Sequence, residues 1–511
     1  CSFDFEFGTS KNKKVFGASL YDDKELLQKL AFEGMKDRYG AGNREAMDRV
    51  RKELEVIHEL GFGAYFLTTW DIVRYAMSRN FYHVGRGSGA NSVVAYCLKI
   101  TNVCPIELDL YFERFLNRKR KSPPDFDIDF GHEDRDQVVD YIFKRHGTEH
   151  TALMGATNTF KDRSIIRELG KAYGLPKSEI DRLVREPENA LNDNEITRMI
   201  LSIYNDIEDF PNLRTIHSSG VLISDLPITT YTALDMPPKG FQTAQMDMYT
   251  AEDIGFEKFD ILSQRGISHI KDTVELVREN QGIKLDIHDL AKVKNDPELQ
   301  QQLYKGDTIG CFYIESPAMR QLLKKLRCKT YTTLVAASSI IRPGVASSGM
   351  MAEYTRRFHN PAMTTYLHPI MEQQLKETYG VMVYQEDVLK IGIHFFGLSG
   401  EDADLLRRMM SGKARGKHHI LAIKEKAFRH AAAQGIDEGV AKEVWRRLES
   451  FAGYSFSKAH SASFAVESFQ DLFLKRYFPL EFMTAVIRNE GGFYRWRNYV
   501  HEARRAGAKI H

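Results

Sequence analysis

The stretch Pro-Pro-Asp-Phe-Asp-Ile-Asp-Phe, residues 123–130, alternates acidic and apolar side chains. Successive side chains of a β-strand point to opposite faces, so Asp125, Asp127 and Asp129 share one face while the apolar residues between them face a core. Neighbouring carboxylates repel one another unless cations lie between them, and clustered oxygen ligands suit Mg²⁺ or Mn²⁺ better than zinc. The stretch therefore predicts a strand that carries a divalent-metal site. A half-exposed edge strand with merely solvated acids is the alternative.

A glycine-rich motif, Gly-Arg-Gly-Ser-Gly-Ala at residues 85–90, precedes this stretch. Glycines let the backbone approach an anion closely, and the N–H groups of a helix start, together with Ser88 and Arg86, can bind a phosphate. The motif is neither a Walker loop nor a dinucleotide fingerprint, and a plain turn is the alternative. A phosphate-binding loop beside a divalent-metal site indicates nucleotidyl transfer, because that reaction needs both.

The composition is that of an ordinary multidomain protein. A chain of 511 residues is too long for one hydrophobic core and predicts three or four domains. No apolar run is long enough to cross a membrane, and five cysteines without a Cys-x-x-Cys pair favour a reducing, cytoplasmic setting. The first residue is Cys rather than Met, so we expect a fragment or a processed product.

The net charge of +2 conceals several local basic clusters. A single basic run is usually a solvated face, but several runs around an acidic metal site suggest that a polyanion is guided toward cations. The clusters are Arg114, Arg118, Lys119, Arg120 and Lys121; Arg320, Lys324, Lys325 and Arg327; Arg356 and Arg357; and Arg407, Arg408, Lys413, Arg415 and Lys417.

The hydrophobic pattern predicts a mixed sheet domain with a small helical insert, followed by a large helical domain. Residues 43–60 carry a helical apolar stripe, and residues 81–96 fit a short strand, the glycine-rich turn and a helix. A helical insert is predicted from Asp162 to about residue 210, and a strand-rich block at 220–262. Beyond Gln264 the pattern is mostly helical.

Two basic residues outside the clusters have a functional and a structural interpretation. Lys258 and Asp260 share a face of their predicted strand, where they could serve a metal and phosphate site or form a structural ion pair. Arg342 precedes a Pro-Gly turn, where it could contact phosphate or only fix the loop.

Several ordered motifs resemble those of the bacterial DNA polymerase III alpha subunits, the C-family replicative polymerases. The resemblance begins with Gly-Arg-Gly-Ser-Gly-Ala, Glu-Arg-Phe-Leu-Asn at 113–117 and Pro-Asp-Phe-Asp-Ile-Asp-Phe at 124–130. It continues through Lys-Phe-Asp at 258–260, Arg-Pro-Gly at 342–344 and further motifs, among them Tyr-Gln-Glu at 384–386, Leu-Arg-Arg-Met at 406–409 and the run from Phe451 to His460. So many motifs in one order make the resemblance highly specific.

The resemblance implies roles for individual residues. In that family the first two acids of the Asp stretch and the acid of Lys-Phe-Asp bind the catalytic metals, which implicates Asp125, Asp127 and Asp260, with Asp129 in support. It implies two Mg²⁺ ions, for which Mn²⁺ could substitute. The residues implied near the triphosphate, the incoming nucleotide or the template are Arg86, Gly87, Ser88, Lys258, Arg114, Arg342, Arg407, Arg408 and Lys413, with Lys458 and His460 as supporting candidates.

The resemblance also implies an α+β fold with a palm of the polymerase-beta-like nucleotidyltransferase type. We expect the palm at 1–155 and 216–265, a helical thumb at 156–215 and a mostly helical fingers domain at 266–511. The implied activity is template-directed transfer of dNMP from dNTP to a primer 3′-hydroxyl by a two-metal mechanism with pyrophosphate release. The implied partners are primer–template DNA and, in a full-length protein, a sliding clamp, a clamp loader and a proofreading subunit. Sequences matching the N-terminal phosphoesterase-like and C-terminal clamp-binding modules are not found, so we expect a core fragment.

Two functions of other classes remain as alternatives. A nucleotidyltransferase that adds one nucleotide to a small acceptor would need the same acids, although the dispersed basic clusters and the large helical region argue against it. A folded but inactive nucleic-acid-binding fragment would bind primer–template DNA in a salt-sensitive way without incorporating nucleotides. Template-directed extension of a primer by many nucleotides would exclude both.

Overall fold

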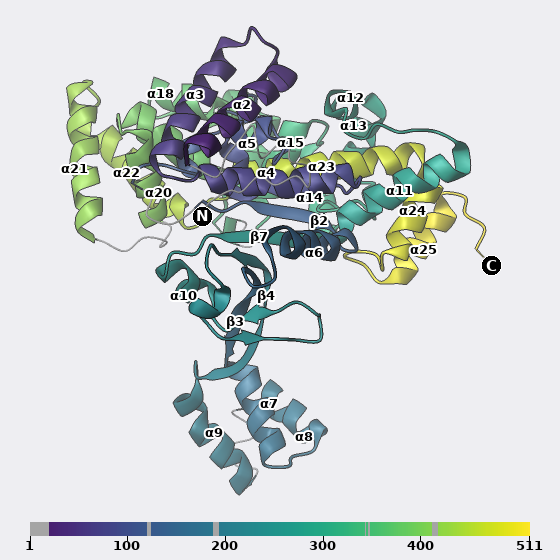
Figure 1. The fold of residues 1–511 in the computed structure, drawn as a ribbon. Coiled ribbons are helices and arrows are strands. Elements are labelled where there is room, and N and C mark those ends of the chain that lie inside the picture. Colours follow the sequence, from purple (N-terminus) through teal and green to yellow (C-terminus); the bar gives the residue numbers. More distant parts are fainter. Residues whose placement is uncertain are drawn as a thin grey trace. The chain divides into compact units, whose positions relative to one another are not determined.

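The computed structural model describes residues 20–119, 124–187, 194–342, 344–345, 348–410 and 417–510 (Figure 1). It is a mixed α+β structure that divides into two compact units. The first combines Cys1–Ile142 with Phe259–His511, and the second is Phe143–Lys258. Within the described residues, helices are too short or too polar to cross a lipid bilayer.

Within the described residues, the acidic stretch lies in a mixed seven-stranded sheet. Strand β1 (His83–Arg86) pairs antiparallel with β2 (Asp127–Gly131), which pairs in parallel with β7 (Lys258–Gln264). The strand predicted over 123–130 is confirmed from Asp127 onward, whereas Asp125 precedes the strand. The apolar residues of the stretch, Phe126, Ile128 and Phe130, are buried as predicted.

Aromatic packing on α4 (Gly63–Ser78) fixes the start of the acidic strand. The Tyr65 ring stacks on Phe126 and Phe259, with ring centroids 5.6 and 4.9 Å apart. Its hydroxyl also accepts the backbone N–H of Phe126 at 3.0 Å. Tyr65 therefore holds the segment just before β2 in two ways, through the Phe126 backbone and ring, and also packs on Phe259 of β7.

Helices before the acidic strand follow the predicted pattern, since α3 (Arg44–Glu59) covers the helix expected at 43–60. The glycine-rich motif forms a 3-10 turn, η1 (Gly87–Asn91), ahead of the short α5 (Val93–Cys97). The remaining elements of this part are α2 (Leu20–Tyr39), η2 (Phe112–Arg114) and α6 (Asp134–His146).

The C-terminal part of the first unit is helical, as predicted beyond Gln264. Its central helix, α23 (Lys458–Tyr477), lies in a large core against α11 (Arg265–Gln281) and α15 (Tyr331–Ile340). A second core surrounds Trp445. The other elements are α12 (Leu290–Lys294), α13 (Pro297–Tyr304), α14 (Pro317–Leu326), α17 (Met350–His359), η4 (Pro361–Met363), α18 (Pro369–Leu375), η5 (Lys376–Thr378), α19 (Gln385–Lys390), η6 (Ile391–Phe395), α20 (Gly400–Met410), α21 (Lys417–Ala433), α22 (Glu438–Ala452), α24 (Pro479–Arg488) and α25 (Trp496–Arg505).

The second unit contributes four strands to the seven-stranded sheet and carries a helical insert. Its strands follow the order β4-β3-β6-β5, in which the long β3 (Thr151–Thr159) and β4 (Pro211–Ile223) pair antiparallel. The helical insert predicted from Asp162 is confirmed, and its first helix stops before Gly174, where φ is +73°. The unit's other elements are α7 (Asp162–Ala172), α8 (Lys177–Arg185), α9 (Glu195–Ile207), η3 (Ile228–Thr230), β5 (Leu234–Asp235), β6 (Thr243–Ala244) and α10 (Met248–Asp253).

Candidate metal and nucleotide site

Three carboxylates converge at the ends of β2 and β7. Asp127 and Asp260 are direct partners in the parallel pairing, so their side chains leave the same face of the sheet. Asp125, just before β2, completes the group: one oxygen from each lies within 4.8 Å of the others. Asp260 is buried and the other two are half-buried.

This group fits a divalent cation. Among the described residues it is the one cluster of three or more His, Cys, Asp or Glu side chains whose ligand atoms converge in this way. The donors are all carboxylate oxygens, which Mg²⁺ and Mn²⁺ prefer and which a structural zinc site seldom uses alone. Three like charges at this separation disfavour one another, and a bound cation relieves that repulsion.

Asp129 shares the acidic face but lies deeper, 3% exposed. Arg86 Nε donates to its Oδ2 at 2.9 Å, and Arg86 Nη1 donates to Asp127 Oδ2 at 3.2 Å. Burial raises the pKa of Asp129, while the Arg86 guanidinium acts in the opposite direction. Asp129 is thus held in an ion pair beside the three-acid group and supports the position of Arg86.

The glycines of the 85–90 motif are required by close packing on the acidic strand. A Cβ on Gly87, where φ is +75°, would lie 2.6 Å from Asp127 Oδ2, and one on Gly89 would lie 2.4 Å from the Phe126 ring. Ser88 Oγ approaches the Asp125 carbonyl oxygen at 3.4 Å. The glycines therefore bring the loop and Arg86 up to the acids, a role that the phosphate-loop interpretation did not include.

The helix after the loop does not offer its N–H groups to a phosphate. Buried Glu53 accepts the N–H groups of Val93 and Val94, each at 3.0 Å, and the Ser92 hydroxyl at 2.8 Å. These are the first N–H groups of α5, so its N-terminus is already bound by a carboxyl group of the protein itself. The predicted contribution of a helix start is therefore wrong for α5. A phosphate would have to use η1, Ser88 and Arg86.

Three arginines gather around His460, on the first turn of α23. Burial, together with the nearby charges of Arg86, Arg342 and Arg114, lowers the pKa of His460 to about 3. Arg342 lies 3.3 Å above the centre of the Phe456 ring, which itself packs edge-on against His460. His460 is therefore neutral, and the three guanidinium groups near it form a cationic region in the first unit. Arg86 links this region to the acids, because it is bonded to Asp127.

Other predicted phosphate contacts are already engaged within the protein. Gln385 Oε1 accepts from Arg114 at 2.6 Å and from Arg407 at 3.4 Å. Arg407 also forms a buried ion pair with Asp404, with Nη2 and Oδ1 2.8 Å apart. These hydrogen bonds join η2, which carries Arg114, to α19 and α20. Arg114 is also one of the three arginines near His460.

Lys458 is the predicted residue whose placement fits a nucleotide contact least. It is 3% exposed, and its Nζ donates to the Leu108 carbonyl at 2.9 Å and to Glu377 at 2.8 Å. Its backbone N–H donates to buried Glu386. Arg408 is half-buried on α20, and Lys258 begins the strand that carries Asp260. Lys413, like Arg120, Lys121 and Arg415, lies outside the described residues.

Sequence reasoning missed several residues that build this site. Glu53, Tyr65 and Gln385 each bind a predicted site residue or its neighbouring backbone across long stretches of chain. The sequence motif included Phe456, but it did not predict that the Phe456 ring stacks against the Arg342 guanidinium. A buried Glu in an otherwise apolar helical stripe is the single signal that could have drawn attention to Glu53.

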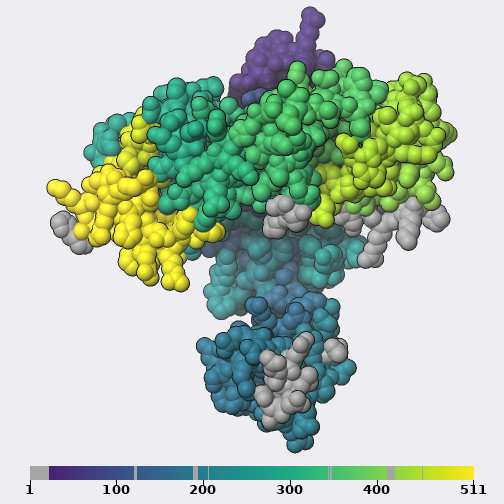
Figure 2. All heavy atoms as spheres, turned by 180° about the vertical axis from the view of Figure 1, so that it is seen from behind, coloured from purple at the N-terminus to yellow at the C-terminus, as the bar shows by residue number. Residues whose placement is uncertain are grey.

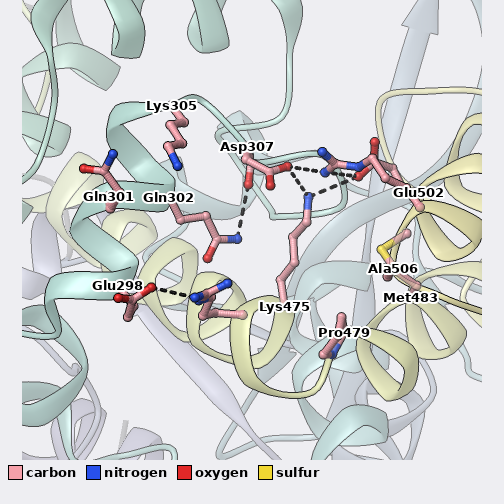
Figure 3. Close-up of a pocket in the computed structure, with 12 residues that line it drawn as sticks. Glu298, Gln301, Gln302, Lys305, Asp307, Lys475, Pro479, Met483, Glu502 and Ala506 are labelled. Carbon is pink, nitrogen blue, oxygen red and sulfur yellow. Dashed lines mark hydrogen bonds and ion pairs between the residues drawn. The ribbon is translucent and has the colours of Figure 1, made fainter.

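A second polar cluster of the first unit lies in a cavity of about 360 Å³ between α13, α23, α24 and α25 (Figure 3). Most of its charged groups form ion pairs with one another. Asp307 is 3.1 Å from Lys475 Nζ and 2.6 Å from Arg505 Nη2, and Glu298 is 2.6 Å from Arg476. These ion pairs join helices, and the exposed Lys305 also lines the cavity.

Comparisons with known proteins agree with the geometry. Residues 25–263 match the family model of the bacterial DNA polymerase III alpha NTPase domain, and residues 267–435 match that of the bacterial DNA polymerase III alpha subunit finger domain. An error-prone DNA polymerase of Symbiobacterium thermophilum is 35% identical over 504 residues, which cover 95% of this chain and 46% of the relative.

Two relatives with another name are similar to nearly the same extent. The DNA polymerase III subunit alpha of Halalkalibacterium halodurans is 34% identical over 507 residues, covering 95% of this chain and 45% of that protein. That of Aquifex aeolicus is 31% identical over 534 residues, covering 95% and 46%. The chain thus spans about half the length of the curated relatives it matches.

Proposed function

The chain belongs to the bacterial DNA polymerase III alpha family, and we propose that it carries the DNA-synthesising core of such a polymerase. The reaction would be template-directed transfer of dNMP from a dNTP to a primer 3′-hydroxyl, with release of pyrophosphate. The observation that carries this proposal is the convergence of Asp125, Asp127 and Asp260 beside an arginine-rich region in a chain of this family.

Asp125, Asp127 and Asp260 would hold the catalytic metals, since they supply converging carboxylate oxygens. Two Mg²⁺ ions bound there, or Mn²⁺ in their place, would lower the pKa of the primer 3′-hydroxyl and offset charge on the α-phosphate and the leaving pyrophosphate. The protein's own part is to fix the carboxylates, through the β2–β7 register and through Tyr65 packing on Phe126 and Phe259.

Arginines around His460 would bind the triphosphate. A guanidinium makes paired hydrogen bonds to phosphate oxygens and stays charged at every relevant pH. Arg342 is exposed and stacked on Phe456, so it can meet a nucleotide without first breaking an ion pair that holds the fold. Arg86 would exchange part of its bonding with Asp127 for phosphate when cations neutralise the acids. Gly87 and Ser88, which follow Arg86 in the chain, and Lys258, two residues before Asp260, would also contact the triphosphate.

The remaining basic residues would act in two ways. Arg114 and Arg407 would mainly orient η2, α19 and α20 around the nucleotide, because Gln385 and Asp404 already engage them. Arg408 and Lys413 remain proposed contacts of the nucleotide or the template.

We propose the domain names on the same basis. Residues 1–155 and 216–265 would form a polymerase-beta-like palm, 156–215 the thumb and 266–511 the fingers. The match of 267–435 to a finger-domain model supports the last of these. The division into compact units falls at other positions, 143 and 258, so the strands β3 and β4 group with the helical insert in that division.

Partners and location follow from the proposed activity. The chain would act on primer–template DNA and dNTPs in the cytoplasm. Contacts with a clamp, a clamp loader or a proofreading subunit would belong to the full-length protein. We further propose that synthesis by this chain alone is distributive; long products made in a single binding event, measured with trap DNA, would contradict that.

Primer extension tests the proposal directly. Wild type should extend a labelled primer by several template-directed nucleotides with Mg²⁺, and Asp127→Asn should abolish extension. Asp48→Asn is the matched control, because Asp48 is an exposed aspartate on α3. Extension by Asp127→Asn at near wild-type rate would refute the metal assignment. Binding of DNA by a folded wild type that extends no primer would favour the binding-only alternative.

A further inference from the structure

An exposed aromatic and basic segment lies at the start of α25, where the proposed chemistry has no use for it. In Phe493-Tyr494-Arg495-Trp496-Arg497, Phe493 is 64% exposed and Trp496 is 68% exposed. Both arginines of the segment are exposed as well. Figure 2 shows this C-terminal part of the chain, in yellow, at the surface of the molecule.

The surroundings of the segment are strongly basic. Residues 488–509 contain six Lys or Arg side chains, namely Arg488, Arg495, Arg497, Arg504, Arg505 and Lys509, against Glu490 and Glu502. Residues 488–509 therefore carry a formal charge of +4, although Arg488 and Arg505 form ion pairs with Asp272 and Asp307 outside this range. Arg495 and Arg497 form no ion pair with any described residue. A surface with this charge attracts a polyanion.

The loop that presents the rings is held firmly from below. Tyr499 Oη accepts the N–H groups of Gly492 and Tyr494, each at 2.9 Å. The N–H of Phe493, between them, donates to buried Glu315 at 2.6 Å. Tyr499 Oη in turn donates to the Glu315 carboxylate at 3.0 Å. Three successive backbone N–H groups are therefore bound by one buried Glu–Tyr pair.

The hydrogen bonds from this loop to Glu315 and Tyr499 require glycine at positions 491 and 492. A Cβ on Gly491, where φ is +74°, would lie 2.5 Å from the Tyr499 ring, and one on Gly492 would lie 2.3 Å from Glu315 Oε1. The backbone is thus fixed while Phe493 and Trp496 project into water. Exposing two large aromatic rings on a rigid support is unfavourable in an isolated protein and typical of a binding surface.

We propose that the platform of Phe493, Arg495, Trp496 and Arg497 binds single-stranded nucleic acid, with bases stacked on the two rings and phosphates on the two arginines. Unpaired bases expose their faces for stacking, whereas bases in a duplex stack on one another, so the rings select a single strand. This rests on the proposed function, under which the ligand is the unpaired template strand ahead of the primer end.

Binding to DNA with and without a single-stranded overhang tests the platform. The probe is a fluorescein-labelled duplex of two separate strands, either blunt or with a 5′ overhang of about 12 nucleotides, titrated by anisotropy. Wild type should bind the overhang DNA more tightly than the blunt DNA. The double variant Phe493→Ala/Trp496→Ala should lose at least roughly fivefold in affinity for the overhang DNA, with its affinity for the blunt duplex unchanged.

Tryptophan fluorescence supplies a readout that does not depend on catalysis. The chain has three tryptophans, of which Trp445 is buried, Trp70 half-buried and Trp496 exposed. A base stacked on Trp496 should quench its emission when oligo(dT) is added. Trp496→Phe keeps a stacking ring, so it should keep most of the affinity and lose the quenching. Both positions are exposed, so these variants should retain the wild-type circular dichroism spectrum.

The outcomes separate this proposal from the polymerase proposal. Overhang binding with Trp496 quenching but without primer extension would keep the platform and refute the polymerase. Extension with equal overhang affinity in wild type and the double variant would overturn the platform and keep the polymerase. A change in sedimentation of the variants without a change in DNA binding would also overturn it, because the rings would then contact another protein copy.

Discussion

Two polar clusters of the first unit, the acids at β2 and β7 and the ionic group in the Figure 3 cavity, use similar residues to opposite effect. In the cavity, Asp307 lies between Lys475 and Arg505, so opposite charges meet. At the strand ends, Asp127 and Asp260 face each other with Asp125 close by, so like charges meet. The first arrangement holds helices together. In the second, Arg86 offsets part of the repulsion at Asp127, and a bound divalent cation would relieve more of it.

The pKa values of two acids, Asp307 in the cavity and Glu467 on α23, move in opposite directions. The pKa of Asp307 is lowered: burial alone would raise it, but Lys475 and Arg505 together outweigh burial. Burial raises the pKa of Glu467 on α23 well above its usual value, and the acids Asp471 and Asp129 raise it further. The sign of the neighbouring charges therefore decides the direction in which the pKa of each acid moves.

The largest expected difference between the clusters is in catalysis. Asp260→Asn should lower the rate of single-nucleotide incorporation by about 10³-fold or more, because it removes a metal ligand worth several kcal/mol in the transition state. Asp307→Asn should leave the rate within about twofold. Rapid-quench incorporation with Mg²⁺ measures both. Equal losses of incorporation rate in the two variants would show that the two clusters do not differ in their role in catalysis.

Stability should show the reverse order. Asp307→Asn leaves Lys475, which is 8% exposed, without its nearest carboxylate. We expect the free energy of unfolding to fall by about 1–3 kcal/mol, less than for a fully buried pair because Asp307 is partly exposed. Urea denaturation followed by circular dichroism measures this. The exposed Asp48→Asn should change stability by no more than about 0.5 kcal/mol, and an equal loss there would show that the Asp307 pair contributes nothing special.

Metal ions should stabilise one cluster only. At ten times its dissociation constant, Mg²⁺ should stabilise wild type by about 1.4 kcal/mol through mass action, which thermal unfolding would register without any substrate. Asp127→Asn should lose most of this shift and Asp307→Asn should keep it. An undiminished Mg²⁺ shift in Asp127→Asn would mean that the metal binds elsewhere.

The smallest effect is a pH dependence of opposite sign in two acids. The lowered pKa of Asp307 means that its stabilisation is present above the ordinary aspartate pKa and lost as the pH falls below it. The raised pKa of Glu467 means that wild type loses stability as the pH rises above the ordinary glutamate pKa, because Glu467 then ionises in the unfolded state but keeps its proton in the folded state.

Glu467→Gln should therefore unfold at a higher temperature than wild type at pH 8–9, with the difference shrinking toward pH 5. Melting curves of both proteins across this range give the difference directly. Parallel curves would indicate that Glu467 is already charged in the folded protein.

Local patterns determined the parts of this protein that depend on periodicity. The alternation of residues 125–130 was enough to predict that Phe126, Ile128 and Phe130 are buried, since a strand has a period of two, but it did not predict the burial of Asp129. The helix at 43–60, the helical insert and the helical C-terminal part followed from apolar spacing in the same way. The family, too, could be recognised from motifs in order.

Only the tertiary structure decided which charged groups meet. The register of β2 with β7 brings Asp127 to Asp260, Gln385 and Asp404 occupy Arg407, and Glu377 with the Leu108 carbonyl draws Lys458 inward. None of these pairings has a local signature, because each depends on long-range packing and on the burial that follows from it. The sequence determined which residues carry charge; the folded chain decided which charges are neutralised within the protein and which are left to bind metal, nucleotide and DNA.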